Sequence, residues 1–225
     1  MKILALDTAT EGCSVSLGIG DRRIDRYVEL ERGHAEQLLP MIDGVLAEGG
    51  VTLGALDAIA FGRGPGGFTG VRLAASVAQG LAFGAGIGVV PISDLAAVAQ
   101  HVHQQDPSVR RVLVVNDARM REIYWAHFEC TESLVPAGVE RVSASVDVTL
   151  PEGEGAWAAA GRGLRAEPKL AERCRAGGAR LFPDLLPRAS EILALARSMV
   201  AGGRILDPAE ALPVYVRDNV AEPSM

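Results

Sequence analysis

The chain has 225 residues, of which 48% are hydrophobic and 22% charged, a composition that excludes intrinsic disorder and supplies a sizeable core. Its formal net charge of −6 disfavours independent binding to nucleic acid, because proteins that bind it alone usually carry a basic patch. Three cysteines without a Cys-x-x-Cys pair indicate reduced thiols in a cytoplasmic protein, rather than disulfides or a zinc site. Only four apolar residues separate Lys2 from Asp7, so no signal peptide is expected.

Residues 1–107 predict one α/β unit. Apolar runs and alternating patterns indicate strands at Ile3–Leu6, Cys13–Leu17, Arg22–Leu30, Ala58–Phe61 and Gly88–Ile92. A 3.6-residue period indicates helices at His34–Glu48, with Pro40 inside it, and at Thr69–Phe83. Residues 73–93 carry no charge, but their glycines and Pro91 predict a buried helix and strand rather than a membrane span.

Residues 108–225 predict a second, related unit. Leu113–Asp117 is an apolar run that ends in Asp, and an alternating strand follows it at Ile123–Phe128. The same arrangement begins the chain, displaced by 110 residues, so that Asp7 corresponds to Asp117. The rest of this half is rich in small residues, and Ala189–Ala201 is its one clear helix. We therefore expect a duplicated fold whose second copy is truncated.

A glycine-rich loop, Gly62–Arg72, leaves a predicted buried strand and opens a helix, which is a geometry that attracts anions. It lacks the lysine of a Walker loop and the later acidic residue of a dinucleotide fold. A tight connection capped by Thr69 is the alternative interpretation. Arg72, however, opposes the helix dipole in the first turn, and an anion or a partner carboxylate would explain it. The candidate anion or nucleotide site comprises Asp7, Thr8, Arg63, Gly66, Gly67, Thr69, Arg72 and Asp117.

Both N-terminal helices carry more apolar surface than packing on one sheet face requires. The second also has small residues at four-residue intervals, which allow another helix to approach closely. Packing on the chain's own sheet explains part of this pattern, and the excess width favours an interface with a second protein. The predicted interface residues are His34, Leu38, Met41, Ile42, Val45, Gly70, Val71, Ala74, Ala75, Ala78 and Ala82.

The spacing of reactive side chains reveals no catalytic constellation. His101 and His103 are two residues apart on a helical stretch and point in different directions, and Cys13 lies in mid-strand. Asp7 with the glycine loop leaves a nucleotide-binding phosphotransferase or ATPase as an alternative function. A peptidase has neither a nucleophile–base pair nor a metal pair to support it.

Four segments, in this order, together resemble the TsaB (YeaZ) family: ILALDTAT at 3–10, GHAEQLLP at 33–40, FGRGPGGFTGVR at 61–72 and LPVYVRD at 212–218. The resemblance runs over the whole chain. It implies the actin, sugar-kinase and heat-shock ATPase fold, built from two RNase H-like units. It also implies a non-catalytic subunit for synthesis of threonylcarbamoyladenosine beside the anticodon of transfer RNA, which activates a TsaD-like transferase through the two N-terminal helices and is joined by a TsaE-like ATPase.

The same resemblance implies what the chain lacks. TsaD has a metal-binding His-x-x-x-His pair after the strand that matches Gly88–Ile92, whereas this chain reads PISDLAAV there. No metal or other cofactor is therefore expected in this chain, and ATP and metal are expected in the partner subunits. The resemblance further implies a homodimer when TsaD is absent, contact with transfer RNA only through the complex, and no membrane association.

Overall fold

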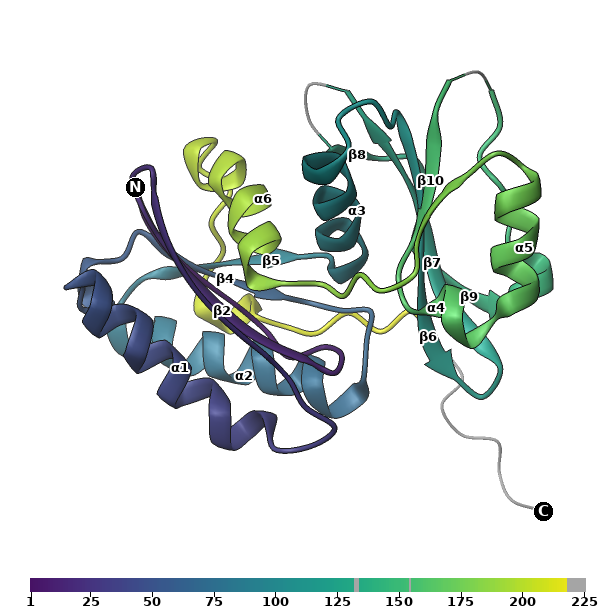
Figure 1. Ribbon diagram of the computed structural model, residues 1–225. Coiled ribbons are helices and arrows are strands. Elements are labelled where there is room, and N and C mark those ends of the chain that lie inside the picture. Colours follow the sequence, from purple (N-terminus) through teal and green to yellow (C-terminus); the bar gives the residue numbers. More distant parts are fainter. Residues whose placement is uncertain (132–133, 154, 218–225) are drawn as a thin grey trace, which may run out of the picture.

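The computed structural model describes residues 1–131, 134–153 and 155–217. Two sheets stand side by side with helices on their faces (Figure 1). The first sheet has the order β3-β2-β1-β4-β5, in which β1 to β3 form an antiparallel meander and β4 and β5 run parallel to β1. Its strands are β1 (Lys2–Asp7), β2 (Gly12–Ile19), β3 (Arg22–Glu29), β4 (Ala58–Gly62) and β5 (Gly88–Ile92). The five strands of this sheet are the five that the sequence predicted for residues 1–107.

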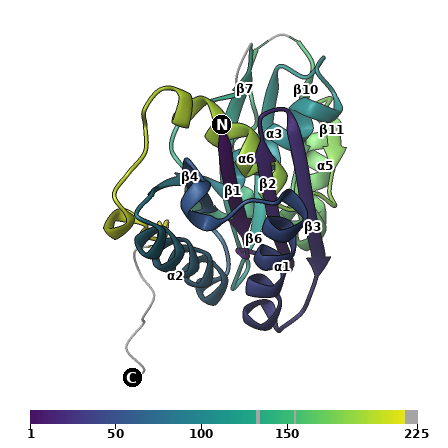
Figure 2. The ribbon, with the colours of Figure 1, turned by 90° about the vertical axis from the view of Figure 1, so that its left-hand side faces the viewer.

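Helices cover both faces of the first sheet. α1 (His34–Gly49) and α2 (Phe68–Ala85) lie together on one face, and α6 (Ala189–Ala201) lies on the other (Figure 1, Figure 2). α1 continues through Pro40. The alternative interpretation of the glycine loop placed Thr69 at the N-cap of this helix. The N-cap is Gly67, and Thr69 lies inside α2.

The second sheet repeats the order of the first. In the order β11-β10-β6-β7-β8, the strands β6, β7, β10 and β11 occupy the places of β1, β2, β4 and β5, and β9 also pairs with β7. The predicted second unit is therefore present, and its later strands are only three or four residues long. The bounds are β6 (Arg111–Arg119), β7 (Glu122–Cys130), β8 (Leu134–Pro136), β9 (Arg141–Ala144), β10 (Trp157–Ala160) and β11 (Arg180–Phe182).

One prediction for the second half was wrong, because Ala189–Ala201 is not its one clear helix. α5 (Pro168–Ala176) covers the face of the second sheet that points away from the first sheet (Figure 1). It has as many charged residues as apolar ones, and only Leu170 and Cys174 mark the buried side, too few to give a period. The shorter elements are α4 (Gly163–Ala166), η1 (Leu53–Ala55), η2 (Ser145–Asp147) and η3 (Pro208–Glu210).

Two helices cross between the units. α3 (Asp94–Gln105) follows the first sheet in the chain but packs on β6 and β7 of the second. α6 follows the second sheet but packs on β1 and β2 of the first, and the two helices touch (Figure 1). The strands of the first sheet lie before the predicted boundary at residues 107 and 108, and those of the second sheet lie after it. α3 and α6 each pack on the sheet of the other unit and so connect the two units.

The uncharged stretch at residues 73–93 forms most of α2 and all of β5, a helix followed by a strand, as predicted. Within the three described ranges, no helix combines the length and the apolar character that crossing a bilayer requires.

Candidate functional site

A cavity of roughly 900 Å³ opens between the two sheets, at the carboxyl ends of β1 and β6. The turn after β1, the glycine loop before α2 and the end of β6 form its walls. Of the candidate anion-site residues, those that line this cavity are Thr8, Gly66, Gly67, Thr69 and Asp117. The fold therefore brings together residues that are far apart in the sequence, as a shared binding site requires.

Asp7 and Asp117 end equivalent strands and make the same local hydrogen bond. Asp7 Oδ1 accepts the N–H of Ala9 at 3.0 Å, and Asp117 Oδ1 accepts the N–H of Arg119 at 2.8 Å. Each aspartate thus fixes the turn two residues beyond it. This supports the equivalence inferred from the 110-residue displacement. The two sites differ in exposure, because Asp7 is fully buried and Asp117 faces the cavity.

A second buried carboxyl group, Asp94, lies beside Asp7. It is the first residue of α3, whose N-cap Ser93 accepts the N–H of Ala96 at 3.1 Å, and its carboxylate accepts the N–H of Gly64. Burial raises the pKa of Asp7 to about 6 and the pKa of Asp94 well above its usual range. Each carboxyl group of the pair therefore holds its proton to a higher pH than an exposed one does. Sequence reasoning missed Asp94, and its only signal was an acid placed after an apolar strand.

Asp7 and Asp94 converge on Gly62. A Cβ at Gly62 would collide with an oxygen of each carboxyl group, so this glycine is required by close packing. Within the described part of the chain, no group of three or more His, Cys, Asp or Glu side chains is placed to hold a metal ion.

Two predicted arginines already have partners within the chain. Both terminal nitrogens of Arg63 donate to the Glu140 carboxylate, at 3.0 and 3.2 Å. The guanidinium of Arg72 lies 3.6 Å from the ring centroid of Phe68 and donates to the Tyr215 hydroxyl at 2.6 Å. A partner carboxylate explains Arg63, and aromatic faces explain Arg72 in the first turn of α2. Neither side chain lines the cavity.

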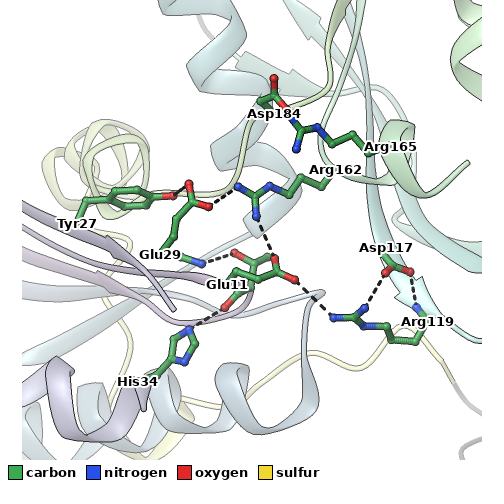
Figure 3. Close-up of polar contacts among 11 residues, drawn as sticks. Glu11, Tyr27, Glu29, His34, Asp117, Arg119, Arg162, Arg165 and Asp184 are labelled. Atoms are coloured by element: carbon green, nitrogen blue, oxygen red, sulfur yellow. Dashed lines mark hydrogen bonds and ion pairs between the residues drawn. The ribbon is translucent and has the colours of Figure 1, made fainter. Parts of the chain in front are cut away.

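The charged rim of the cavity was missed by sequence reasoning. Arg162, from the second unit, pairs with Glu29 and lies 3.7 Å from Glu11, both of the first unit (Figure 3). Arg119 reaches Glu11 at 3.5 Å and Asp117 at 3.2 Å (Figure 3). Arg162 holds the pKa of Glu29 below its usual value. Carboxylates of one unit thus neutralise arginines of the other, through partners more than 100 residues apart that no local pattern reveals.

The predicted interface residues lie largely in the chain's own core. Those buried against the first sheet are Leu38, Ile42, Val45, Ala74, Ala75, Ala78 and Ala82, and Val71 is also buried. Met41 and His34 are half-buried, and His34 Nε2 lies 2.9 Å from the carbonyl oxygen of Thr10. At Gly70 a Cβ would collide with the carbonyl of Thr8, whose hydroxyl donates to the Gly70 carbonyl at 2.7 Å. The strongest apolar stripes therefore face this sheet and offer no side chain to a partner.

The other side of the two helices presents a different surface, which we name the outer face. It consists of Leu39, Gly44, Gly80, Phe83 and Gly84. Leu39 is 49% exposed and Phe83 is 80% exposed. At Gly44, Gly80 and Gly84 a Cβ would meet no heavy atom within 4 Å. Each glycine costs the helix about 1 kcal/mol relative to alanine. The described chain gives no packing reason for that cost.

Comparison with known proteins establishes the family. A curated Escherichia coli protein, "tRNA threonylcarbamoyladenosine biosynthesis protein TsaB", is 39% identical over 228 residues, which cover 98% of this chain and 96% of that protein. The chain belongs to the TsaB (YeaZ) family. A Haemophilus influenzae TsaB is 48% identical over 129 residues, covering 56% of this chain and 53% of that protein. The family model described as "TsaD: tRNA N6-adenosine threonylcarbamoyltransferase" matches residues 28–174.

Solved structures agree with this assignment. The structure described as "YeaZ from Pseudomonas aeruginosa" is 41% identical, has a TM-score of 0.86, and matches 95% of this chain and 99% of that chain. A second structure, described as an uncharacterized protein with similarity to peptidase YEAZ from Pseudomonas aeruginosa, is 42% identical with a TM-score of 0.88, over 96% of this chain and 99% of that chain. The predicted TsaB resemblance and its α/β fold class are confirmed.

Proposed function

We propose that this TsaB-family chain is a non-catalytic subunit required for threonylcarbamoylation of the adenosine beside the anticodon in transfer RNA. The proposal rests on 39% identity, over 98% of this chain, to a TsaB that is named for this pathway. A non-catalytic role is supported by the state of the reactive groups. Asp7 and Asp94 are fully buried. Burial of Cys13, Cys130 and Cys174 raises each thiol pKa to about 11, which also disfavours a cysteine peptidase.

The partner in this proposal is a TsaD-like transferase, which the chain activates by docking through its outer face. Exposed Leu39 and Phe83 supply apolar area, and Gly80 with Gly84 lets a partner helix approach closely. The match to the TsaD family model supports pairing between related folds. When the transferase is absent, we expect a homodimer through the same face.

In this proposal a TsaE-like ATPase joins the pair. ATP and metal are bound by the partner subunits, the ATPase and the transferase, and not by this chain. The net charge of −6 supports a subunit that meets transfer RNA only within the complex. Three buried free thiols are compatible with a cytoplasmic location.

The test is complementation. This chain is expressed with the TsaD-like protein of its own organism in Escherichia coli cells depleted of their TsaB, and threonylcarbamoyladenosine in hydrolysed transfer RNA is measured by mass spectrometry. We expect restoration by the wild-type chain and by Asp117→Asn, and loss of restoration with Gly80→Arg. A wild-type pair that restores no modification contradicts the proposal.

A second candidate function, nucleotide or anion binding as in a phosphotransferase or ATPase, is favoured by one observation. Thr8, the glycine loop and Asp117 line one cavity together with Arg119 and Arg162. A phosphate group there has to displace Glu11 and Glu29 from these arginines. Calorimetry with ADP tests this candidate. If it is correct, ADP binds to the wild-type chain and binds more tightly to Glu11→Gln. If neither protein gives a heat of binding, this candidate is excluded.

A further inference from the structure

A smaller hollow lies on the opposite face of the first sheet from α1 and α2. It has a volume of roughly 330 Å³ and forms where β2, β3, α3 and α6 meet. We name it the α6 pocket. Its lining includes Tyr27, His101, Gln105, Arg188, Ser190 and Glu191.

Two opposite charges in the α6 pocket lack a charged partner. Arg188 and Glu191 lie three residues apart at the start of α6, yet neither forms an ion pair with any residue that the structure describes. The Arg188 guanidinium lies 4.6 Å from the ring centroid of Tyr27, and its buried Nε has no hydrogen-bond partner. Glu191 is only 5% exposed, and its carboxylate accepts the Ser190 hydroxyl at 2.8 Å. Glu191 is buried and Arg188 is half-buried, and burying a charge without a charged partner is costly, so the two groups point to a missing ligand.

The remaining charges around the pocket are matched. Arg23 pairs with Asp25 at 2.7 Å, and Arg26 pairs with Glu48. Burial lowers the pKa of His101, so its imidazole is neutral. What remains on the same wall is the Arg188 guanidinium and the Glu191 carboxyl group, whose pKa burial raises and whose ionised form a ligand cation favours.

We propose that the α6 pocket binds a free α-amino acid, with the ligand carboxylate held by Arg188 and the ligand ammonium held by Glu191. A simple anion or a simple cation leaves one of the two charges unmatched, whereas a zwitterion satisfies both. The positive end of the α6 dipole adds to the attraction for the carboxylate. The volume lies at the lower end of the range of about 300–1,000 Å³ for small-molecule sites, and Gln105 with Ser190 favours a small polar side chain.

The test compares matched ligands on the full wild-type chain. Calorimetry or ligand-detected NMR follows titrations with glycine, L-serine and L-threonine, and then with propionate, which lacks the ammonium, and L-serine amide, which lacks the carboxylate. We expect at least one amino acid to bind, and the two single-charge analogues to bind about tenfold or more weakly, as loss of one charged hydrogen bond implies.

Variants test the assignment of each charge. Arg188→Gln and Glu191→Gln are each expected to weaken amino-acid binding about tenfold or more, while exposed Lys169→Gln on α5 leaves it unchanged. Absence of saturable binding by all three amino acids overturns the proposal. So does propionate binding as tightly as L-serine, which indicates an anion site only, and this ligand comparison does not depend on any variant folding.

Discussion

The carboxyl groups of Asp7 and Asp94 meet beneath Gly62 with neither side chain exposed to solvent. One ends β1 and the other begins α3, so the pair joins the first sheet to the helix that packs on the second. Asp94 also accepts the N–H of Gly64, and Asp7 that of Ala9. This buried pair therefore anchors the glycine loop and the turn after β1 from below.

The pair predicts that stability falls as pH rises. Burial raises both pKa values, so the folded chain retains protons that the unfolded chain releases above about pH 4. The stabilisation is full below that pH and is lost as pH rises through about 6. Asp94→Asn still accepts from Gly64 and can donate to Asp7. We expect it to reduce the decline in unfolding free energy between about pH 5 and pH 8 by about 1–3 kcal/mol. Urea unfolding at both pH values measures this, and equal declines in both proteins contradict the raised pKa values.

Neighbouring leucines on α1 are predicted to differ sharply in their contribution to stability. Leu38 is fully buried against the sheet, and Leu39 is 49% exposed. Leu38→Ala should lower the free energy of unfolding by about 2–5 kcal/mol because it leaves a cavity. Leu39→Ala should change it by less than about 1 kcal/mol. Similar losses in denaturant unfolding are incompatible with the assigned buried face.

Two glycines of α2 are predicted to respond in opposite ways to the same substitution. In Gly70→Ala the new methyl group meets the Thr8 carbonyl, so we expect a loss of about 3 kcal/mol or more. In Gly80→Ala the methyl group enters open space, and we expect a gain of up to about 1 kcal/mol from helix propensity. Thermal unfolding of the two variants provides the comparison. A Gly70→Ala chain as stable as wild type rules out the close approach of α2 to Thr8.

The rim of the cavity is predicted to restrain motion more than it stabilises the fold. Arg162→Gln removes the contacts with Glu11 and Glu29, which are partly exposed, so the unfolding free energy should change by less than about 1 kcal/mol. Amide exchange should quicken at Leu30, whose N–H donates to the Glu11 carbonyl at 2.8 Å. Arg165→Gln, which removes the pair with Asp184, is the matched control (Figure 3). Equal exchange at Leu30 in both variants argues against a restraining rim.

Local periodicity predicted most of the elements, because a buried face leaves a repeating signal in the sequence. Ala189–Ala201 was placed with its observed bounds, and Asp7 with Asp117 revealed the repeated strand order. Periodicity also identified the buried face of α1 and α2, but an apolar stripe is the same whether a sheet or a partner covers it. Leu38 and Ala78, which were predicted for the interface, are buried in the chain's own core.

Long-range pairs escaped sequence reasoning for a different reason. Arg162 meets Glu29 across 133 positions, and the side chains of Asp7 and Asp94 meet from opposite ends of the first unit. Such contacts depend on how the sheets and the exchanged helices are placed, which no local pattern encodes. Arg63 and Arg72 were assigned to an anion site from their place in the glycine loop, and the partners that the structure gives them are the distant Glu140 and Tyr215.

The central claim is that the outer face of α1 and α2 binds a TsaD-like transferase, and sedimentation of the two purified proteins together tests it most directly. Wild type and the control Lys169→Glu on α5 are predicted to form the complex. Leu39→Glu and Gly80→Arg are predicted to weaken it about tenfold or more while keeping a wild-type melting temperature. Undiminished association of both outer-face variants with the transferase would contradict the account.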